Sequence, residues 1–158
     1  MAVLALIATL ALAQADSFCE GRGTALVVST GEHLLIQCEA DKMVQSHAVS
    51  LGKGGTGKTK RGDNKTPLGS YPLGRPRASK KFGMFIPIAY PTPQQAAKGY
   101  TGGDIGVHGP ARAFTWAGRI NSAIDWTQGC IALASDEDIG KLASWVRLKK
   151  PRIIHIEP

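Results

Sequence analysis

Glycine and proline divide this chain into short segments, and this division limits which folds it can adopt. The 158 residues include 19 glycines and 9 prolines. The apolar runs between them, such as 25–29 and 84–90, have the length of β-strands and not of long helices. Only residues 136–147 repeat apolar side chains with the period of an amphipathic helix. The pattern predicts a mainly β domain, a sandwich or open barrel, with one principal α-helix near the C-terminus.

Turn and cap residues mark the ends of several expected elements. The runs 25–29 and 33–38 flank a three-residue turn that contains glycine, which predicts a β-hairpin. Thr92 before Pro93 is typical of the start of a short helix, and Ser135 is a typical cap for the long one. Further strands are expected at 43–51, 84–90 (with Pro87 at a sheet edge or a bulge), 104–108, 130–133 and 152–157.

The first fifteen residues read as a secretory signal peptide. Residues 1–15 carry no charge, and a short apolar run ends in the small-x-small pattern Ala13-Gln14-Ala15. We expect cleavage between Ala15 and Asp16, which leaves a single domain at 16–158 in the periplasm or outside the cell. The run is too short to hold the mature protein in a bilayer. No basic residue precedes the run, and the alternative interpretation is a buried strand or helix.

A second motif, GKGGTGKT at 52–59, has the spacing of a nucleotide-binding loop. Such a loop works because a helix follows it and points its N-terminus at the phosphates. Here Thr59 is followed by a stretch with three glycines, two prolines and no helical period. We therefore predict a flexible, irregular basic loop over 52–65 that binds no nucleotide.

The net charge of +7 indicates either an acidic partner or simply good solubility. Nucleic acid is a poor candidate, because the basic residues are scattered outside 53–61 and no aromatic residues are interleaved with them. Peptidoglycan, which carries free carboxylates, suits an exported protein better. The histidines and cysteines show no spacing typical of metal ligands, so no metal or other cofactor is expected.

Three cysteines in an exported protein leave one over when two of them pair. Cys19 precedes the first expected strand and Cys38 ends the second, so we predict a Cys19–Cys38 disulfide. Cys130 then remains, either as a buried structural residue or as a reactive thiol. Gly129 before it allows an unusual turn at a loop-to-strand junction, where backbone amides can face an oxyanion. This local sequence favours the reactive thiol.

A thiol nucleophile needs a base, and His108 is the best candidate among four histidines. It ends a short apolar strand and is followed by Gly109. We interpret the other three, His33, His47 and His155, as surface or structural residues.

The segments Ile105–Gly109 and Asp125–Leu133 resemble the L,D-transpeptidase (YkuD-type) catalytic domain. That family places a histidine–glycine pair on one strand and a Ser/Thr-His-Gly-Cys segment after an insert. The resemblance covers about residues 24–157 and includes the segment 66–71, so that GKGGTGKT becomes the loop leading into it. It implies a β-rich catalytic domain that acts on peptidoglycan stem peptides.

The resemblance also implies roles for individual residues. Cys130 is the expected nucleophile and His108 its base, while the Gly109 carbonyl orients the imidazole and Gly129 lies in the oxyanion region. The family's thiolate attacks the carbonyl of the third stem residue and expels the terminal D-Ala. An amine then resolves the acyl-enzyme in a transpeptidase, and water does so in a carboxypeptidase or endopeptidase. The expected substrate-binding residues are Trp126, Thr127, Gln128, Arg112 and Arg119.

The chain departs from the family pattern at three places. Gln128 stands where the family often has a histidine, and Ala132 stands where an arginine or asparagine is usual. The insert between His108 and Cys130 is also longer than is common. Arg112 and Arg119 within it are the candidates for the missing cation, and the alternative interpretation of each is a solvated loop arginine. Besides the transferase and the hydrolase, a catalytically silent wall-binding module remains an alternative, for which Cys130 would have to be buried or disulfide-bonded.

Overall fold

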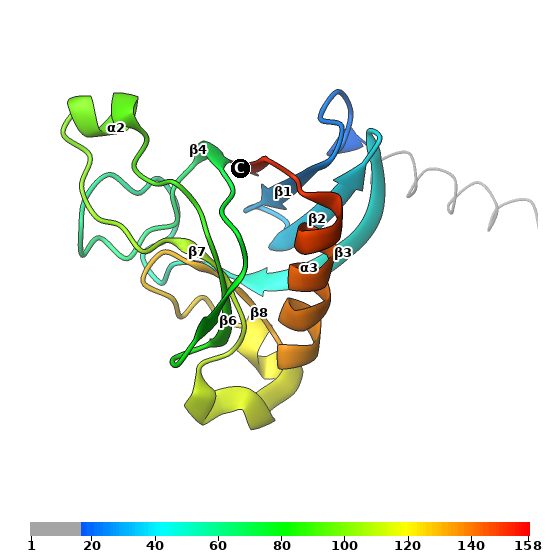
Figure 1. The fold of residues 1–158 in the computed structure, drawn as a ribbon. Helices are drawn as coiled ribbons and strands as arrows, with labels where there is room; N and C mark the ends of the chain where they lie inside the picture. Colours follow the sequence, from blue (N-terminus) through cyan, green and yellow to red (C-terminus); the bar gives the residue numbers. More distant parts are fainter. Residues whose placement is uncertain (1–16) are drawn as a thin grey trace, which may run out of the picture.

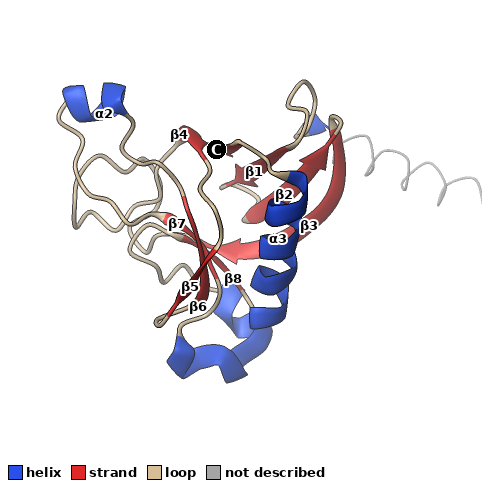
Figure 2. Ribbon diagram, viewed as in Figure 1, coloured by secondary structure: helices blue, strands red, loops and turns tan. Residues whose placement is uncertain are grey.

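The computed structural model describes residues 17–158, so the expected signal peptide at 1–15 lies outside the described residues. Figures 1 and 2 show one curled sheet with a long helix packed along it. In chain order the elements are β1 (Ala25–Ser29), β2 (Leu34–Glu39), β3 (Lys42–Ser50), β4 (Gly69–Pro72), β5 (Arg77–Ser79), β6 (Gly83–Pro87), α2 (Pro93–Ala97), β7 (Gly106–His108), the 3₁₀ segment η1 (Arg112–Ser122), β8 (Ile131–Leu133), α3 (Asp136–Lys149) and β9 (Ile153–Glu157).

The nine strands form one sheet in the order β4-β9-β1-β2-β3-β8-β7-β6-β5. Strand β3 joins its two halves, because its first part pairs with β2 and its last two residues pair with β8. Two pairs, β1–β9 and β7–β8, are parallel, and the other pairs are antiparallel. The sheet curls into a half-barrel around its own core, which confirms the predicted mainly β fold with one principal helix.

The local signals in the sequence have structural counterparts. Strands β1 and β2 form the predicted antiparallel hairpin. Ser135 caps α3 by accepting a hydrogen bond from the Asp138 amide at 3.1 Å. Thr92 and Gln95 form a capping box at the start of α2. These three predictions are confirmed. The two caps could be recognised in the sequence because their side chains bond within one turn of their own position.

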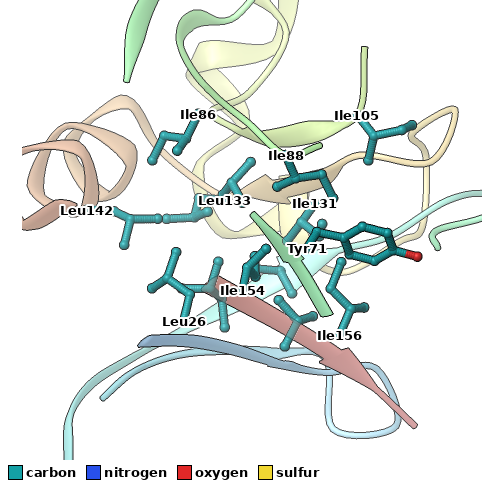
Figure 3. Close-up of a cluster of buried hydrophobic side chains, with 14 of the residues drawn as sticks. Leu26, Tyr71, Ile86, Ile88, Ile105, Ile131, Leu133, Leu142, Ile154 and Ile156 are labelled. Atoms are coloured by element: carbon teal, nitrogen blue, oxygen red, sulfur yellow. The ribbon is translucent and has the colours of Figure 1, made fainter. Parts of the chain in front are cut away.

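The main core lies inside the curl of the sheet, against α3. Figure 3 shows side chains from both halves of the sheet pointing toward one another. Helix α3 contributes its four buried positions, which are those of the predicted apolar stripe: Ile139, Leu142, Ala143 and Val146. The largest fully buried members from the strands include Leu26, Leu35, Tyr71, Ile86, Ile131, Leu133 and Ile154.

A smaller cluster covers the opposite face of the first hairpin. Val27 and Ile36 alternate with the core residues along β1 and β2, so they face away from the main core. Cys19 and Cys38 pack there and form a disulfide, with Cα atoms 5.4 Å apart. The bridge ties the chain before β1 to the end of β2.

Two parts of the fold differ from the sequence expectations. Pro87 does not place its strand at the sheet edge; β6 lies between β5 and β7, and Pro87 is the last residue of the strand. The segment 112–122 was not expected to be helical, but it forms η1, which is kinked at Gly118 (φ +52°). Its backbone is held by contacts from distant positions, including Ser50 Oγ, which donates to the Asn121 carbonyl at 2.6 Å. No helix within residues 17–158 is both long and apolar enough to span a membrane.

The buried stripe of α3 supports a direct test of the fold. Leu142→Ala should lower the free energy of unfolding by about 2–5 kcal/mol, because Leu142 is fully buried and the truncation leaves a cavity. Leu148→Ala is the matched control on the same helix; its side chain is 74% exposed, and its effect should stay within about 0.5 kcal/mol. Urea unfolding followed by circular dichroism measures both. Equal effects at the two positions would contradict this packing.

Candidate active site

His108 and Cys130 meet because their strands are neighbours. Strands β7 and β8 pair in parallel, with Val107 opposite Ile131. His108 ends β7 and Cys130 immediately precedes β8, so both lie at this seam. They line the same pocket, which has a volume of about 610 Å³. The structure thus brings together the two residues that sequence analysis singled out.

The His108 ring is oriented on several sides. Its Nδ1 lies 2.6 Å from the Gly109 carbonyl oxygen, so the ring proton belongs on Nδ1 and Nε2 is left as the basic nitrogen. Phe82 stacks on the ring at a centroid distance of 3.6 Å, and the Trp126 ring meets it edge-on at 5.7 Å. Burial lowers the pKa of His108 to about 4, and the charge of Lys81 acts in the same direction against the Gly109 hydrogen bond. The imidazole is therefore neutral at pH 7.

Cys130 is a free thiol at the edge of the pocket. Its Sγ donates to the Asp104 carbonyl at 3.4 Å. Burial raises the pKa of the thiol to about 11, although a hydrogen bond with the Gly106 backbone favours the thiolate. The resting pair is consequently a neutral thiol beside a neutral imidazole.

The turn before the cysteine is fixed by Thr127. The Thr127 hydroxyl donates to the Cys130 carbonyl at 2.7 Å and accepts from the Gly129 amide at 3.1 Å. Gly129 has φ +130°, and a Cβ at this position would lie 2.6 Å from the Lys65 carbonyl oxygen, so only glycine fits. The Gly129 amide, which we expected in the oxyanion region, is thus bonded to Thr127 in this structure.

Gly109 has a packing role in addition to its carbonyl. A Cβ on Gly109 would lie 2.9 Å from Cγ2 of Ile139, the first buried residue of α3. The missing side chain lets the helix approach the strand that carries His108. The residue following the histidine therefore both orients the ring and seats the helix.

The expected substrate-binding residues fall into two groups. Trp126, Thr127 and Gln128 line the pocket, and of these the exposed Gln128 side chain is the most accessible. Arg112 does not line it, since its guanidinium pairs with Asp136 at the start of α3. The side chain of Arg119, in η1, lies outside the described part of the structure.

The loop 52–65 forms one wall of the pocket, and no helix begins at Lys58. Its irregular path was predicted, but a buried ion pair organises it. Asp63 lies 2.8 Å from the Lys58 Nζ and accepts backbone bonds from Thr59, Lys60 and Lys65. Burial alone would raise the pKa of Asp63, but these bonds outweigh it and hold the pKa well below its ordinary value of 3.8.

The same loop supports the cysteine turn. Lys53 donates its amide to the Thr127 carbonyl at 2.9 Å, and the Lys65 carbonyl packs against Gly129. The motif that resembled a nucleotide loop thus buttresses the turn that precedes Cys130. Its lysine is committed to Asp63 and is only 5% exposed.

Sequence reasoning missed the wall of the pocket that comes from β5 and β6. Phe82 and Phe85 flank the His108 ring, and Arg77 and Lys81 lie over these two phenyl rings. All four line the pocket. The sequence shows only that aromatic and basic residues lie close together around Gly83. This local pattern does not indicate contact with a histidine that lies 23 or more positions away.

The three other histidines have partners elsewhere. The Nε2 atoms of His33 and His47 lie 3.0 Å from Asp125 and 2.8 Å from Gln37, respectively. His155 Nδ1 lies 2.7 Å from the Ser70 hydroxyl. None of them lines the pocket, so among the described residues His108 is the only histidine beside Cys130.

A free cysteine and a neutral histidine, placed at the ends of two adjoining parallel strands and lining one pocket, are the residue types of a cysteine–histidine catalytic pair. Residues 23–154 match the model of the YkuD family, described as the L,D-transpeptidase catalytic domain, and the chain belongs to this family. The family resemblance expected from the sequence is confirmed.

Solved structures with this fold include several bacterial proteins. Pgp2, the helical cell shape determining protein of Campylobacter jejuni, superposes with a TM-score of 0.69 at 24% identity, covering 85% of this chain and 47% of Pgp2. Bd1075 of Bdellovibrio bacteriovorus gives 0.62 at 20% identity, covering 84% and 47%. L,D-transpeptidase 3 of Mycobacterium tuberculosis, solved with a faropenem-derived adduct, gives 0.53 at 14%, covering 86% and 60%.

The chain spans about half the length of the first two of these proteins, so the similarity covers one part of each. At these identities the comparison establishes the shared fold. No curated protein sequence matches this chain.

The ion pair inside loop 52–65 gives a second test. Asp63→Asn should cost about 3 kcal/mol in the free energy of unfolding, because it leaves the buried ammonium of Lys58 without its carboxylate. Since the folded pKa of Asp63 is below 3.8, its contribution is present above that pH and fades as the pH falls further. Chemical denaturation at pH 7 and at pH 3 should therefore show a smaller gap between variant and wild type at pH 3.

Glu137→Gln is the matched control, since it makes the same carboxylate-to-amide change in an exposed pair with Lys141. Its cost should be below about 0.5 kcal/mol at both pH values. If Asp63→Asn were as mild as this control, the buried pair would not organise the loop.

Proposed function

We propose that this protein is an exported cysteine acyltransferase that acts on peptidoglycan stem peptides. The observation that carries the proposal is the shared pocket of Cys130 and His108, with the ring held by Gly109 so that Nε2 is basic. Membership of the L,D-transpeptidase family supplies the substrate class. Localisation in the periplasm or outside the cell agrees with the expected signal peptide and with the Cys19–Cys38 bridge.

Acylation begins with transfer of the thiol proton to Nε2 of His108. The sulfur then bonds to the carbonyl carbon of the third stem residue, and the carbonyl oxygen becomes an oxyanion. The bond from that carbon to the amide nitrogen of the terminal D-Ala breaks. His108 returns the proton to this nitrogen, so that free D-Ala leaves and a thioester remains on Cys130.

The cysteine turn is the oxyanion region in this proposal. Thr127 holds its shape from both sides of Gly129. For the Gly129 amide to act as a donor, it must exchange its bond with Thr127 for one with the substrate oxygen. The buried hydroxyl of Thr127 thus orders the turn, while Trp126 and Gln128 are proposed to contact the peptide.

The acceptor decides between the two enzyme activities. An amine that attacks the thioester yields a cross-link or an attached peptide, and His108 takes up the proton of the amine. Water attacks in the same geometry and makes the protein an L,D-carboxypeptidase or endopeptidase. The silent-module alternative required a blocked thiol, but Cys130 is free and lines the pocket, which supports an enzyme.

The GKGGTGKT loop offers no support for nucleotide binding. The amine of Lys58 is bound by Asp63 and the Lys60 carbonyl, so it is not free to reach a phosphate. The chain after Thr59 forms a turn around Asp63 and not a helix. Both facts agree with a structural role for the loop.

Incubation with purified disaccharide-tetrapeptide tests the proposal, with products identified by mass spectrometry. Wild-type protein should release D-Ala. If the protein is a transferase, a cross-linked product should also form when an acceptor amine is supplied. Cys130→Ser should fall to background while keeping its fold, since a hydroxyl is a far weaker nucleophile at neutral pH. His108→Ala should lose about 10²-fold or more of the rate, because the thiol keeps its proton.

Thr115→Ala is a suitable control, because this exposed residue of η1 does not line the pocket. It should retain wild-type turnover. Full activity of Cys130→Ser, or no turnover of any stem peptide by the wild type, would disprove the proposed function.

The same acylation predicts a covalent adduct with a carbapenem. The strained lactam carbonyl should bond to the Cys130 sulfur while its ring C–N bond opens, so the intact protein gains the full mass of the drug. Intact-mass spectrometry should show one adduct in the wild type and none in Cys130→Ser. Labelling that persists in Cys130→Ser would place the reaction elsewhere.

A further inference from the structure

The catalytic pocket carries an excess of positive charge that the proposed mechanism does not use. Four cationic residues line it, Lys58, Arg61, Arg77 and Lys81, against one acidic residue, Asp104. Lys58 is neutralised by Asp63. Within the described part of the chain, the other three cations form no ion pair. The pocket is therefore prepared for an anion.

Two of these cations occupy the hairpin of β5 and β6 and are held in place by aromatic rings. Lys81 Nζ lies 5.3 Å from the centroid of Phe82, and Arg77 Cζ lies 4.8 Å from the centroid of Phe85. The same rings stack beside His108, at centroid distances of 3.6 and 6.2 Å. Cation–π contacts orient a side chain but leave its charge intact. The two cations of the hairpin thus contact the same rings that stack beside the base.

Lys81 acts electrostatically on both reacting groups. Burial is the main cause of both pKa shifts; it lowers the pKa of His108 and raises the pKa of Cys130. The charge of Lys81 lowers both pKa values. An unpaired Lys81 favours the thiolate but opposes formation of the imidazolium. An anion bound to Lys81 would weaken both effects, so the charge state of the reacting pair depends on whether this site is occupied.

We propose that Lys81, assisted by Arg77, binds the free C-terminal carboxylate of the acyl donor on the leaving side of the scissile bond. This inference rests on the proposed function for the identity of the donor. In a terminal residue the carboxylate is separated from the scissile nitrogen by a single carbon, so a cation beside the reacting pair can reach it. An internal peptide bond has no carboxylate there. The pair therefore selects terminal over internal bonds.

The first experiment probes the anion site without any peptide. Iodoacetate carries a carboxylate where iodoacetamide carries a neutral amide. With either reagent, the Cys130 sulfur loses its proton and bonds to the methylene carbon, and iodide leaves. The other two cysteines are joined in a disulfide and do not react. The ratio of the iodoacetate rate to the iodoacetamide rate should drop about fivefold in Lys81→Met, and high salt should reduce it in the wild type.

Matched variants separate charge from structure. Lys81→Arg should keep the wild-type ratio, because it restores the cation. Lys80→Met removes the neighbouring lysine, which does not line the pocket, so this variant should also keep the wild-type ratio of the two alkylation rates. An unchanged ratio in Lys81→Met, or the same drop in Lys80→Met, would overturn the proposal.

The second experiment tests the selection itself. Wild-type protein should cleave a tetrapeptide donor with a free C-terminal carboxylate much faster than the same donor with a C-terminal amide. Lys81→Met should lose most of this preference, mainly through a higher KM for the free acid, and Lys81→Arg should restore it. An equal preference in wild type and Lys81→Met would overturn the inference. If the alkylation ratio depends on Lys81 but no donor is turned over, the anion site stands and the proposed function fails.

Discussion

Parallel pairing between β7 and β8 is the contact on which the candidate active site depends. Each strand has only three residues, and the register places Val107 opposite Ile131. A slip of one residue would turn the side chains of one strand to the other face and separate His108 from Cys130. Val107 and Ile131 are both fully buried in the main core, so the hydrophobic core itself fixes this register.

The elements around this seam make the pairing possible. Strand β8 is also bonded to the end of β3, and β7 to β6, so neither short strand stands alone. Helix α3 closes the face of the seam, and it comes near enough only because residue 109 is a glycine. The fold is therefore organised so that two chain segments twenty-two positions apart present their side chains to one pocket.

The resting electrostatics favour the neutral forms of both Cys130 and His108. With a thiol pKa of about 11 and an imidazole pKa of about 4, proton transfer from Cys130 to His108 is unfavourable in the empty pocket. The thiol proton is directed at the Asp104 carbonyl and not at the ring. A neutral thiol resists oxidation better than a thiolate does. In the proposed mechanism, bound substrate therefore supplies the charges that stabilise the thiolate–imidazolium pair.

The fold and the candidate site differ in how far the sequence could predict them. Ser135, Thr92 and the apolar stripe of α3 act within a few positions, so they could be recognised directly. The family motif identified His108, Cys130 and Gly109, because these residues recur at fixed places in that pattern. The environment of the ring could not be foreseen, since Phe82 reaches His108 only through the register of β6 on β7.

Charged residues show the same limit. Arg112 was a reasonable candidate for the missing cation, but whether an arginine faces a pocket or a nearby carboxylate depends on tertiary structure, and here it meets Asp136. Lys58 was visible in its motif, but its burial against Asp63 was not. Composition gives the number of charges in a chain, whereas the fold decides which of them remain unpaired.

The absence of a charge at Ala132 gives the hairpin cations their significance. Ala132 lies opposite His108 in the β7–β8 register and is fully buried, on the same side of the chain as Cys130. Many family members carry an arginine or asparagine there, so that one strand holds both nucleophile and substrate contact. In this protein two of the unpaired cations of the pocket belong to the β5–β6 hairpin instead: Arg77 lies on β5, and Lys81 lies in the turn before β6. Because β5 is the edge strand and bonds only to β6, the residues on it can change without disturbing the β7–β8 register that holds the reacting pair. In the proposed mechanism, the hairpin selects the substrate and the β7–β8 pair places the nucleophile, so the two tasks belong to separate parts of the fold.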